Sequence, residues 1–462
     1  MDLKNLLYNL PEVTKPIEKK LSFNVKLKWT LIVLVVYSVL STITLWGLES
    51  NSLQRFQYLE VILGTQFGSI ISLGIGPIVM ASIILQLLVG SGLMKIDTNT
   101  SEGKKYFQGL QKLGVFFFIF FEAMVYVLMG GFRAAPGFTS LLITQLMLGG
   151  LIIMFMDEVV TKWGFGSGIS LFIVAGVARS LFTALFQFIG TAGENCLLDF
   201  QNTPCVGRVF IIIQSVINGA PTEALLASIA IAVTAAIFLI IVFAQSLKVE
   251  IPLSYDRLRG YGIKWPLAFF YASVIPVILV SALAANFQLF GGLLENWLGH
   301  ATIIGSFQNG QAVSGMAYWI GNPNLLEATI RGSISWIMAL QGLTHLLFYA
   351  VFSSVFAVLW VKTSGMDEYS QAKKIIASGL QIPGFRKDER ILEVILSRYV
   401  MPLTVMGGLA IGVLAAVSNT LGALVGGTSI LLSVMIMYQM YQSIAQQHAV
   451  DMHPALRGIM GQ

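Results

Sequence analysis

Charge is scarce in this sequence of 462 residues, of which only 11% are Asp, Glu, Lys or Arg while 56% are hydrophobic. A soluble domain carries roughly a quarter charged residues, so the composition excludes an ordinary soluble protein. Cysteine is rarer still: Cys196 and Cys205 are the only two. Two cysteines exclude a disulfide-rich scaffold, although the sequence leaves open whether this pair forms a disulfide.

Motifs for bound nucleotides, metals or covalent catalysis are missing as well. The sequence contains no phosphate-binding loop, dinucleotide fingerprint, zinc-spaced His/Cys set or nucleophile elbow. His448 and His453 stand five residues apart near the end of the chain, a spacing that puts them off a common helix face. We therefore expect neither an enzyme nor a cofactor.

The sequence contains long apolar runs. A bilayer core of about 30 Å needs about 20 apolar residues per helix, and the runs are continuous rather than alternating. The sequence predicts an all-α polytopic membrane protein with ten transmembrane helices, near 29–48, 74–92, 113–131, 139–157, 167–189, 222–243, 265–286, 332–361, 399–419 and 425–444.

Lysine and arginine are distributed unevenly between the loops. They concentrate in residues 1–28 and in the loops after the second, fourth, sixth and eighth spans, whereas the other side holds little more than Arg55, Arg133, Arg208 and Arg331. Since cytoplasmic loops carry the excess of positive charge, we expect a multi-pass protein of the cell membrane with both termini cytoplasmic.

Ten spans divide into five plus five, so two such halves would enter the membrane in opposite senses. Two halves of opposite orientation are typical of inverted repeats, which place a pathway at the interface of the halves. We expect a cytoplasmic amphipathic N-terminus, an N-terminal half, an external loop, a C-terminal half with long cytoplasmic loops at 244–264 and 362–398, and a cytoplasmic tail, over residues 1–28, 29–189, 190–221, 222–444 and 445–462.

Few ionisable or amide groups lie within the spans. Glu122 in the third span must face a partner or water, because a carboxylate at the bilayer centre costs about 2.5–3.5 kcal/mol on insertion scales. It either lines a pathway or hydrogen-bonds another helix, and Asn286 is a candidate partner, although an end cap or an interhelical hydrogen bond explains Asn286 equally simply. Arg179 stands near a span end, where a long side chain reaches the interface.

The second span begins with three helix-breaking residues, Gly74, Gly76 and Pro77, directly after a half-polar segment too short to cross a bilayer. Proline suits the first turn of a helix, and glycine permits a sharp turn before it. Irregular backbone at membrane depth is tolerated only when it is buried in protein or lines a water-filled cavity. The pattern therefore predicts a hinge beside a cavity.

Several stretches resemble signatures of the SecY family of protein-conducting channels, and they occur in family order along the whole chain. They are LGIGPIVMASIILQLLVGSG (73–92), GSGISLFIVAGV (166–177), IPLSYDRLRGYG (251–262), YASVIPVILVSALAANFQL (271–289), IPGFRKDERILE (382–393), RYVMPLTVMGG (398–408) and GGTSILLS (426–433). The loop style and the terminal HPALRG (453–458) look archaeal. The resemblance implies the SecY fold, with two inverted, pseudo-symmetric halves around an hourglass pore.

The same resemblance assigns residues to the parts of such a channel. It places an aliphatic pore ring at Ile75, Val79, Ile169, Ile173, Ile278 and Leu432. It makes residues 55–69 a plug, including Arg55, Leu59, Val61, Ile62, Leu63 and Phe67, with Gly74, Gly76 and Pro77 as its hinge. It puts a lateral gate at Met80, Glu122 and Asn286, although relatives carry a hydroxyl where Met80 stands.

Partners follow from the resemblance too. Arg257, Arg259 and Arg386 match loop arginines that in relatives dock the ribosome or another cytosolic driver. The family implies a heterotrimer with a SecE-type gamma subunit and a small beta subunit, acting on signal sequences and nascent chains and releasing helices into membrane lipid. The expected function is therefore a channel for unfolded polypeptides. The alternatives are a secondary transporter with inverted repeats and an insertase without a pore.

Overall fold

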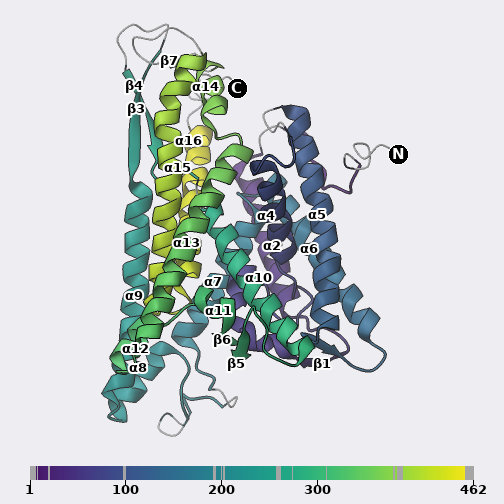
Figure 1. Cartoon of the computed structure of the whole chain (residues 1–462), viewed down its shortest axis with the longest axis vertical. Helices are drawn as coiled ribbons and strands as arrows, with labels where there is room; N and C mark the ends of the chain where they lie inside the picture. Colours follow the sequence, from purple (N-terminus) through teal and green to yellow (C-terminus); the bar gives the residue numbers. More distant parts are fainter. Residues whose placement is uncertain are drawn as a thin grey trace.

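The structure is a computed structural model that describes residues 7, 9–18, 21–96, 100–190, 194–198, 200, 203–255, 262–272, 274–308, 310–377, 380–381 and 389–452. Ten helices fall on or beside the ten apolar runs (Figure 1). They are α2 (Phe23–Thr42), α4 (Gly76–Gly90), α5 (Ser101–Leu128), α6 (Thr139–Trp163), α7 (Gly168–Phe186), α9 (Pro221–Ser246), α10 (Ile275–Leu298), α13 (Trp336–Thr363), α15 (Glu389–Thr420) and α16 (Gly427–Met452).

Helix α4 is short. Its 15 residues rise about 22 Å at 1.5 Å per residue, which is less than a bilayer core of about 30 Å. Before it come η1 (Ser52–Phe56) and α3 (Gln57–Leu63), a 3-10 turn and a short α-helix. Helix α3 packs against α7 and α10, so this preceding segment lies inside the bundle rather than on its surface.

Small sheets and short helices occupy the two ends of the bundle (Figure 1). At one end, β3 (Lys248–Tyr255) pairs antiparallel with β4 (Gly262–Ala268) and with β7 (Leu380–Gln381), next to α14 (Glu368–Ala377). At the other end, β1 (Leu48–Asn51) pairs with β2 (Phe132–Ala134), and β5 (Ser306–Gln308) pairs with β6 (Gln311–Ser314). Three short helices complete the set: α8 (Arg208–Ile217), α11 (Gly315–Ile320) and α12 (Leu325–Ile330).

The predicted seventh span, 265–286, is wrong over its first part. Residues 262–268 form β4, and α10 begins at Ile275 with Pro276 in its first turn. Proline starts a helix readily, whereas the apolar residues of β4 are used in a sheet, with Ile251 and Leu267 buried in a second small core. The first span also begins earlier than predicted, at Phe23.

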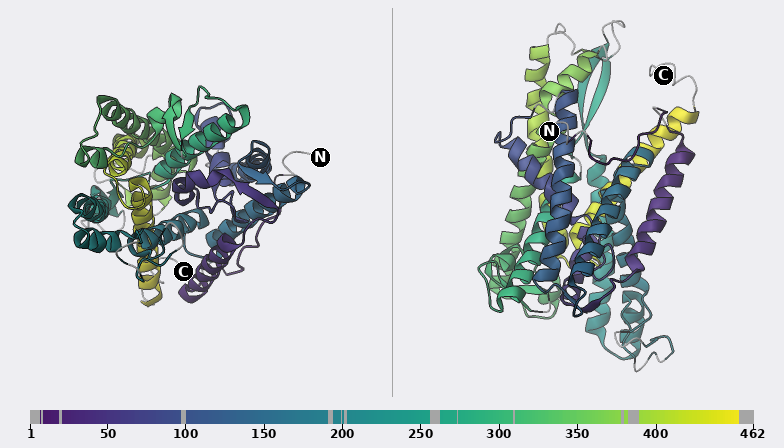
Figure 2. Two further views of the ribbon diagram at one scale, coloured as in Figure 1. Left: turned by 90° about the horizontal axis from the view of Figure 1, so that it is seen from below. Right: turned by 90° about the vertical axis from the view of Figure 1, so that its right-hand side faces the viewer.

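One large hydrophobic core runs through the bundle and includes residues of α2, α4, α5, α6, α7, α10 and α16. Helix α10 is its most enclosed span, with 78% of its apolar window buried. By contrast α2 turns most of its side chains outward, with 17% buried. Seen from below, α2 stands at the edge of the bundle (Figure 2). The outer helices therefore present apolar surface to lipid.

Candidate functional site

Six aliphatic residues from four helices belong to the same core. Ile169 is partly buried, and the other five are buried, at Ile75, Val79, Ile173, Ile278 and Leu432. The helices that carry these residues pack against one another: α10 contacts both α4 and α16, and α16 contacts α7. The helices that carry the predicted ring thus pack around one apolar core.

The segment predicted as a plug contacts one of these six residues, Ile75. A Cβ added at Gly64, where α3 ends, would lie 3.5 Å from Cγ2 of Ile75 and 3.4 Å from Cβ of Phe172. Among the predicted plug residues, Ile62 and Arg55 are partly buried and the others are buried, at Leu59, Val61, Leu63 and Phe67. The end of α3 therefore rests directly on Ile75.

Polar side chains form hydrogen bonds within this segment and the loop that follows it. Oε1 of Glu60 accepts a hydrogen bond of 2.8 Å from the Phe67 amide, and burial raises the pKa of Glu60. The Thr65 hydroxyl lies 2.9 Å from the carbonyl oxygen of Ile71 and 2.7 Å from that of Ser72. Because buried polar groups are costly unless paired, these contacts hold the loop after α3 in one conformation.

The junction between this segment and α4 has the geometry expected of a tight turn. Gly74 adopts a φ of +55°, and a Cβ there would lie 2.3 Å from the carbonyl oxygen of Leu63. The Ile75 amide donates to that same oxygen at 2.8 Å. Gly76 and Pro77 open α4. Only glycine fits at position 74 in this conformation.

The three predicted gate residues lie on helices α4, α5 and α10, which pack side by side through α4. Glu122 is fully buried, and a Cβ at Gly76 would lie 3.0 Å from its Oε2. Within the part of the chain that the structure describes, neither Glu122 oxygen has a hydrogen-bond partner. The suggested Glu122–Asn286 hydrogen bond is therefore absent, and Asn286 donates instead to Ala282 of its own helix at 2.9 Å. Met80 is partly buried on α4.

Arg179 pairs with the loop after α3. Its Nη1 donates to Oε1 of Gln66, in the loop after α3, at 2.5 Å. Both residues line a cavity of about 760 Å³ between α2, α3 and α7, together with Tyr37, Glu60 and Thr183 among others. Sequence reasoning missed this pairing because the two residues are 113 positions apart.

Asp157 is a second residue of the site that the sequence did not single out. It lies near the end of α6, and its Oδ1 accepts from the amide of Ile169 at 3.0 Å, in the first turn of α7. A carboxylate at a helix N-terminus satisfies free amides and favours the helix dipole. Asp157 thereby fixes the start of the helix that carries Ile169 and Ile173. The stretch Gly-Ser-Gly before Ile169 was the only signal of this turn.

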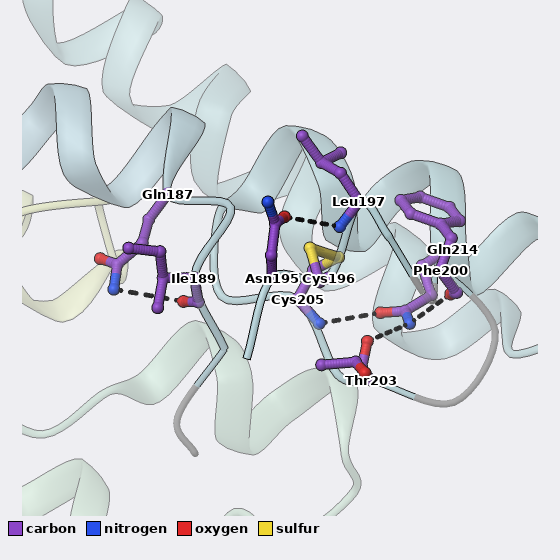
Figure 3. The surroundings of a disulfide bond; sticks show 9 residues. All are labelled: Gln187, Ile189, Asn195, Cys196, Leu197, Phe200, Thr203, Cys205 and Gln214. Carbon is purple, nitrogen blue, oxygen red and sulfur yellow. Dashed lines mark hydrogen bonds between the residues drawn. A yellow bond between two sulfur atoms is a disulfide. The ribbon is translucent and has the colours of Figure 1, made fainter. Parts of the chain in front are cut away.

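The loop after α7 is closed by a disulfide between Cys196 and Cys205 (Figure 3). Gln214 of α8 holds the same loop, since it accepts from the Cys205 amide at 3.1 Å and donates to the carbonyl oxygens of Phe200 and Thr203. At the base, the Gly207 amide donates to the carbonyl oxygen of Gln187 at 2.9 Å. The pairing that the sequence left open is thus formed.

The three arginines predicted to dock a partner, Arg257, Arg259 and Arg386, lie outside the described residues. Along the chain, β3 ends before the first two and β4 begins after them, while β7 precedes the third. The N-terminal segment is strapped to the same end of the bundle, because Lys162 of α6 donates to Oε1 of Glu12 at 2.5 Å and to the carbonyl oxygen of Val13 at 2.6 Å.

Comparison with known proteins covers nearly the whole chain. The SecY family model matches residues 69–441. The protein translocase subunit SecY of Methanothermobacter thermautotrophicus is 42% identical, over 98% of this chain and 97% of the relative.

Two solved structures match the fold. One concerns the SecY plug domain, described as stabilising the closed state of the translocation channel and maintaining a membrane seal. It has a TM-score of 0.83 and 37% identity, over 98% of this chain and 99% of that one. The other is Sec61 in the canine ribosome-channel complex from the endoplasmic reticulum, with a TM-score of 0.79 and 36% identity over the same shares.

Proposed function

Because this chain belongs to the SecY family, we propose that it is the pore-forming subunit of a protein translocase, a channel that conducts unfolded polypeptides across the membrane and is not itself an enzyme. The observation that carries the proposal is the short helix α3, packed against α7 and α10 with its end on Ile75. A stopper seated on an apolar constriction has a use in a channel and none in an insertase without a pore.

In this proposal Ile75, Val79, Ile169, Ile173, Ile278 and Leu432 form the waist of the pore. Aliphatic side chains offer no fixed hydrogen bonds, so any sequence can slide past them. A closed aliphatic constriction also dewets and blocks ions. Residues 55–69 form the plug, and Gly74, Gly76 and Pro77 form the hinge on which it leaves the external funnel.

The lateral gate in this proposal lies where α4 and α5 face α10 and α13, at Met80, Glu122 and Asn286. The buried oxygens of Glu122 and Asn286 gain partners only when the gate rearranges or water enters, which favours a gate that opens readily. A hydrophobic signal helix binds the open state better and so shifts the population toward it. Its apolar core then partitions into lipid.

Orientation follows from the loop with Cys196 and Cys205. Disulfides persist in oxidising, extracellular surroundings, so we place the end of the bundle that carries this loop outside the cell. Ten spans then leave both termini in the cytoplasm, together with the β3–β4 hairpin and α14. Arg257, Arg259 and Arg386 would face a ribosome there, because the arginine fork suits phosphate.

Two small membrane subunits, a SecE-type gamma subunit and a beta subunit, complete the proposed heterotrimer. Energy must come from the cytosolic driver. A secondary transporter is the weaker candidate, because it needs a midplane substrate site built from polar groups and broken helices, whereas the centre of this bundle is aliphatic.

Removal of the plug tests the proposal. The full chain, reconstituted with its partner subunits in a planar bilayer, should leak ions at rest once residues 57–67 are deleted, while the intact channel stays silent. An unchanged resting conductance in the deletion variant, with the protein shown to be inserted, would overturn the proposed plug.

A further inference from the structure

The root of the plug, residues 51–56, is enclosed by external segments on two sides. On one side the Ser52 amide donates to the carbonyl oxygen of Gly131 at 2.9 Å, next to the β1–β2 pairing. On the other side stands the β5–β6 hairpin, which follows α10 in the chain and lies at the same end of the bundle (Figure 1). Leu53, within this root, is 1% exposed.

Phe56 fills the contact between the plug root and α10. Its ring is fully buried, and a Cβ added at Gly292 of α10 would lie 2.4 Å from its Cζ atom. The ring of Phe307, in β5, meets it edge-on with 5.7 Å between the centroids. Such aromatic pairs are favourable beyond the area they bury. Phe56 thus packs against both α10 and the hairpin.

The tip of the hairpin touches the backbone of the root. Gly310 has a φ of +81°, and a Cβ there would lie 1.9 Å from the carbonyl oxygen of Arg55. The Arg55 side chain reaches on to α10, where Nη2 donates to the carbonyl oxygen of Gly292 at 3.3 Å. No side chain larger than hydrogen fits between hairpin and root without moving one of them.

The hairpin itself is fixed to α10. The Phe307 amide donates to Oε2 of Glu295 at 2.8 Å, and a Cβ at Gly291 would lie 3.1 Å from Cζ of Phe307. Since α10 also carries Ile278 and Asn286, the hairpin moves with a helix that belongs to both the pore waist and the lateral gate. Any displacement of α10 reaches the plug root through these contacts.

We propose that the β5–β6 hairpin is a clamp on the plug root, with Gly310 and Phe307 as the positioning residues that set how readily the plug leaves the funnel. The inference rests on the proposed role of residues 55–69 as the plug. The contacts that fix the hairpin run to α10 and to the plug root, so it would tune the closed state without contacting the translocating chain. Movement of α10 during gate opening would lift the clamp and free the plug in one event.

A pair of matched glycine variants tests the clamp. Gly310→Ala introduces both a strained φ and a clash with Arg55, whereas Gly299→Ala carries the same strain at a φ of +74° with nothing within 4 Å of the added Cβ. A cysteine at Leu53, in an otherwise cysteine-free channel with its partner subunits, reports root exposure through its reaction with a membrane-impermeant thiol reagent. We expect Gly310→Ala to raise that reaction rate and the resting leak by about tenfold or more, and Gly299→Ala to change neither.

Equal rates in the two glycine variants would overturn the clamp. Should Gly310→Ala fail to insert, Phe307→Leu, which removes the ring and keeps the apolar volume, must raise the Leu53→Cys reaction rate instead, and an unchanged rate there refutes the proposal equally. The plug deletion distinguishes a failure of the clamp proposal from a failure of the plug proposal. If deleting 57–67 causes a leak while neither clamp variant does, only the clamp is wrong, and if the deletion causes none, the plug is wrong as well.

Discussion

Replacing Gly74 by alanine is the sharpest perturbation of the hinge. Position 74 has a φ of +55°, and the added Cβ would lie 2.3 Å from the Leu63 carbonyl oxygen and 2.8 Å from Cβ of Thr65. The left-handed conformation costs an L-residue about 1–2 kcal/mol. Separating Leu63 from residue 74 also breaks the Ile75–Leu63 hydrogen bond, which contributes about 1 kcal/mol. Both losses fall on the docked plug alone, because a released plug lets residue 74 relax.

The docked state should therefore lose about 2–3 kcal/mol, which is about a 30- to 150-fold rise in the population of displaced plug. The assay is the resting ion conductance of the reconstituted channel, recorded per inserted molecule. Gly92→Ala is the matched control, since it has a φ of +78° and open space around the added Cβ. Equal conductance in the two variants would refute the reasoning, because strain without contact would then explain everything.

Three further predictions concern the surroundings of the plug and the two ends of the bundle. Arg179→Gln removes the donor to Gln66. Because this position is exposed, we take the low end of a hydrogen bond's worth, about 0.5–1 kcal/mol, so the resting leak should rise about two- to fivefold. Arg208→Gln should leave the leak unchanged, and a leak in Arg179→Gln equal to that of this control would count against the Arg179–Gln66 contact. The hydrogen bond and charge of Lys162 lower the pKa of Glu12 below its ordinary 4.5. The contact between Glu12 and Lys162 therefore stabilises the docked N-terminal segment fully at neutral pH. That stabilisation is lost as the pH falls through the lowered pKa of Glu12. A spin label at Glu18 should therefore gain mobility on acidification in the parent chain and be more mobile at neutral pH in Glu12→Gln than in the parent. Equal mobility in the two chains at neutral pH would contradict the contribution of Glu12. Joint replacement of Cys196 and Cys205 by serine should destabilise the loop by about 3 kcal/mol through loop entropy, seen as faster amide exchange at 194–205 with transport unchanged, and unaltered exchange would mean that Gln214 alone holds the loop.

The helices were predictable because a long, continuous apolar run is stable in a membrane only as a helix. The hairpins were not, since the apolar residues of 262–268 form a strand only through their pairing with 248–255. Similarly, a stretch such as 306–314 shows no signal for its contact with Arg55, which depends on how α10 presents Gly292. The clearest local signal was Gly74-Ile75-Gly76-Pro77, whose backbone has the turn that glycine permits.

Within the site, sequence reasoning located side chains but not their partners. Glu122 was expected to face a partner or water, yet it is buried and, among the described residues, neither of its oxygens has a hydrogen-bond partner. The suggested hydrogen bond to Asn286 is absent because Asn286 bonds within its own helix. Gln66, Asp157 and Gly310 escaped notice because polar and glycine residues in loops are common, and only the fold brings each beside its contact.

The central claim is that the aliphatic centre of α4, α7, α10 and α16 is the path of a translocating chain. Single cysteines at Ile75, Val79, Ile169, Ile173, Ile278 and Leu432 should crosslink to a cysteine in a polypeptide arrested during transport. Cysteines at Val35 and Leu239, which are 62% and 65% exposed on the outer face of the bundle, should react only with lipid-borne probes. Crosslinks at Val35 or Leu239 without any at the six core positions would contradict the account.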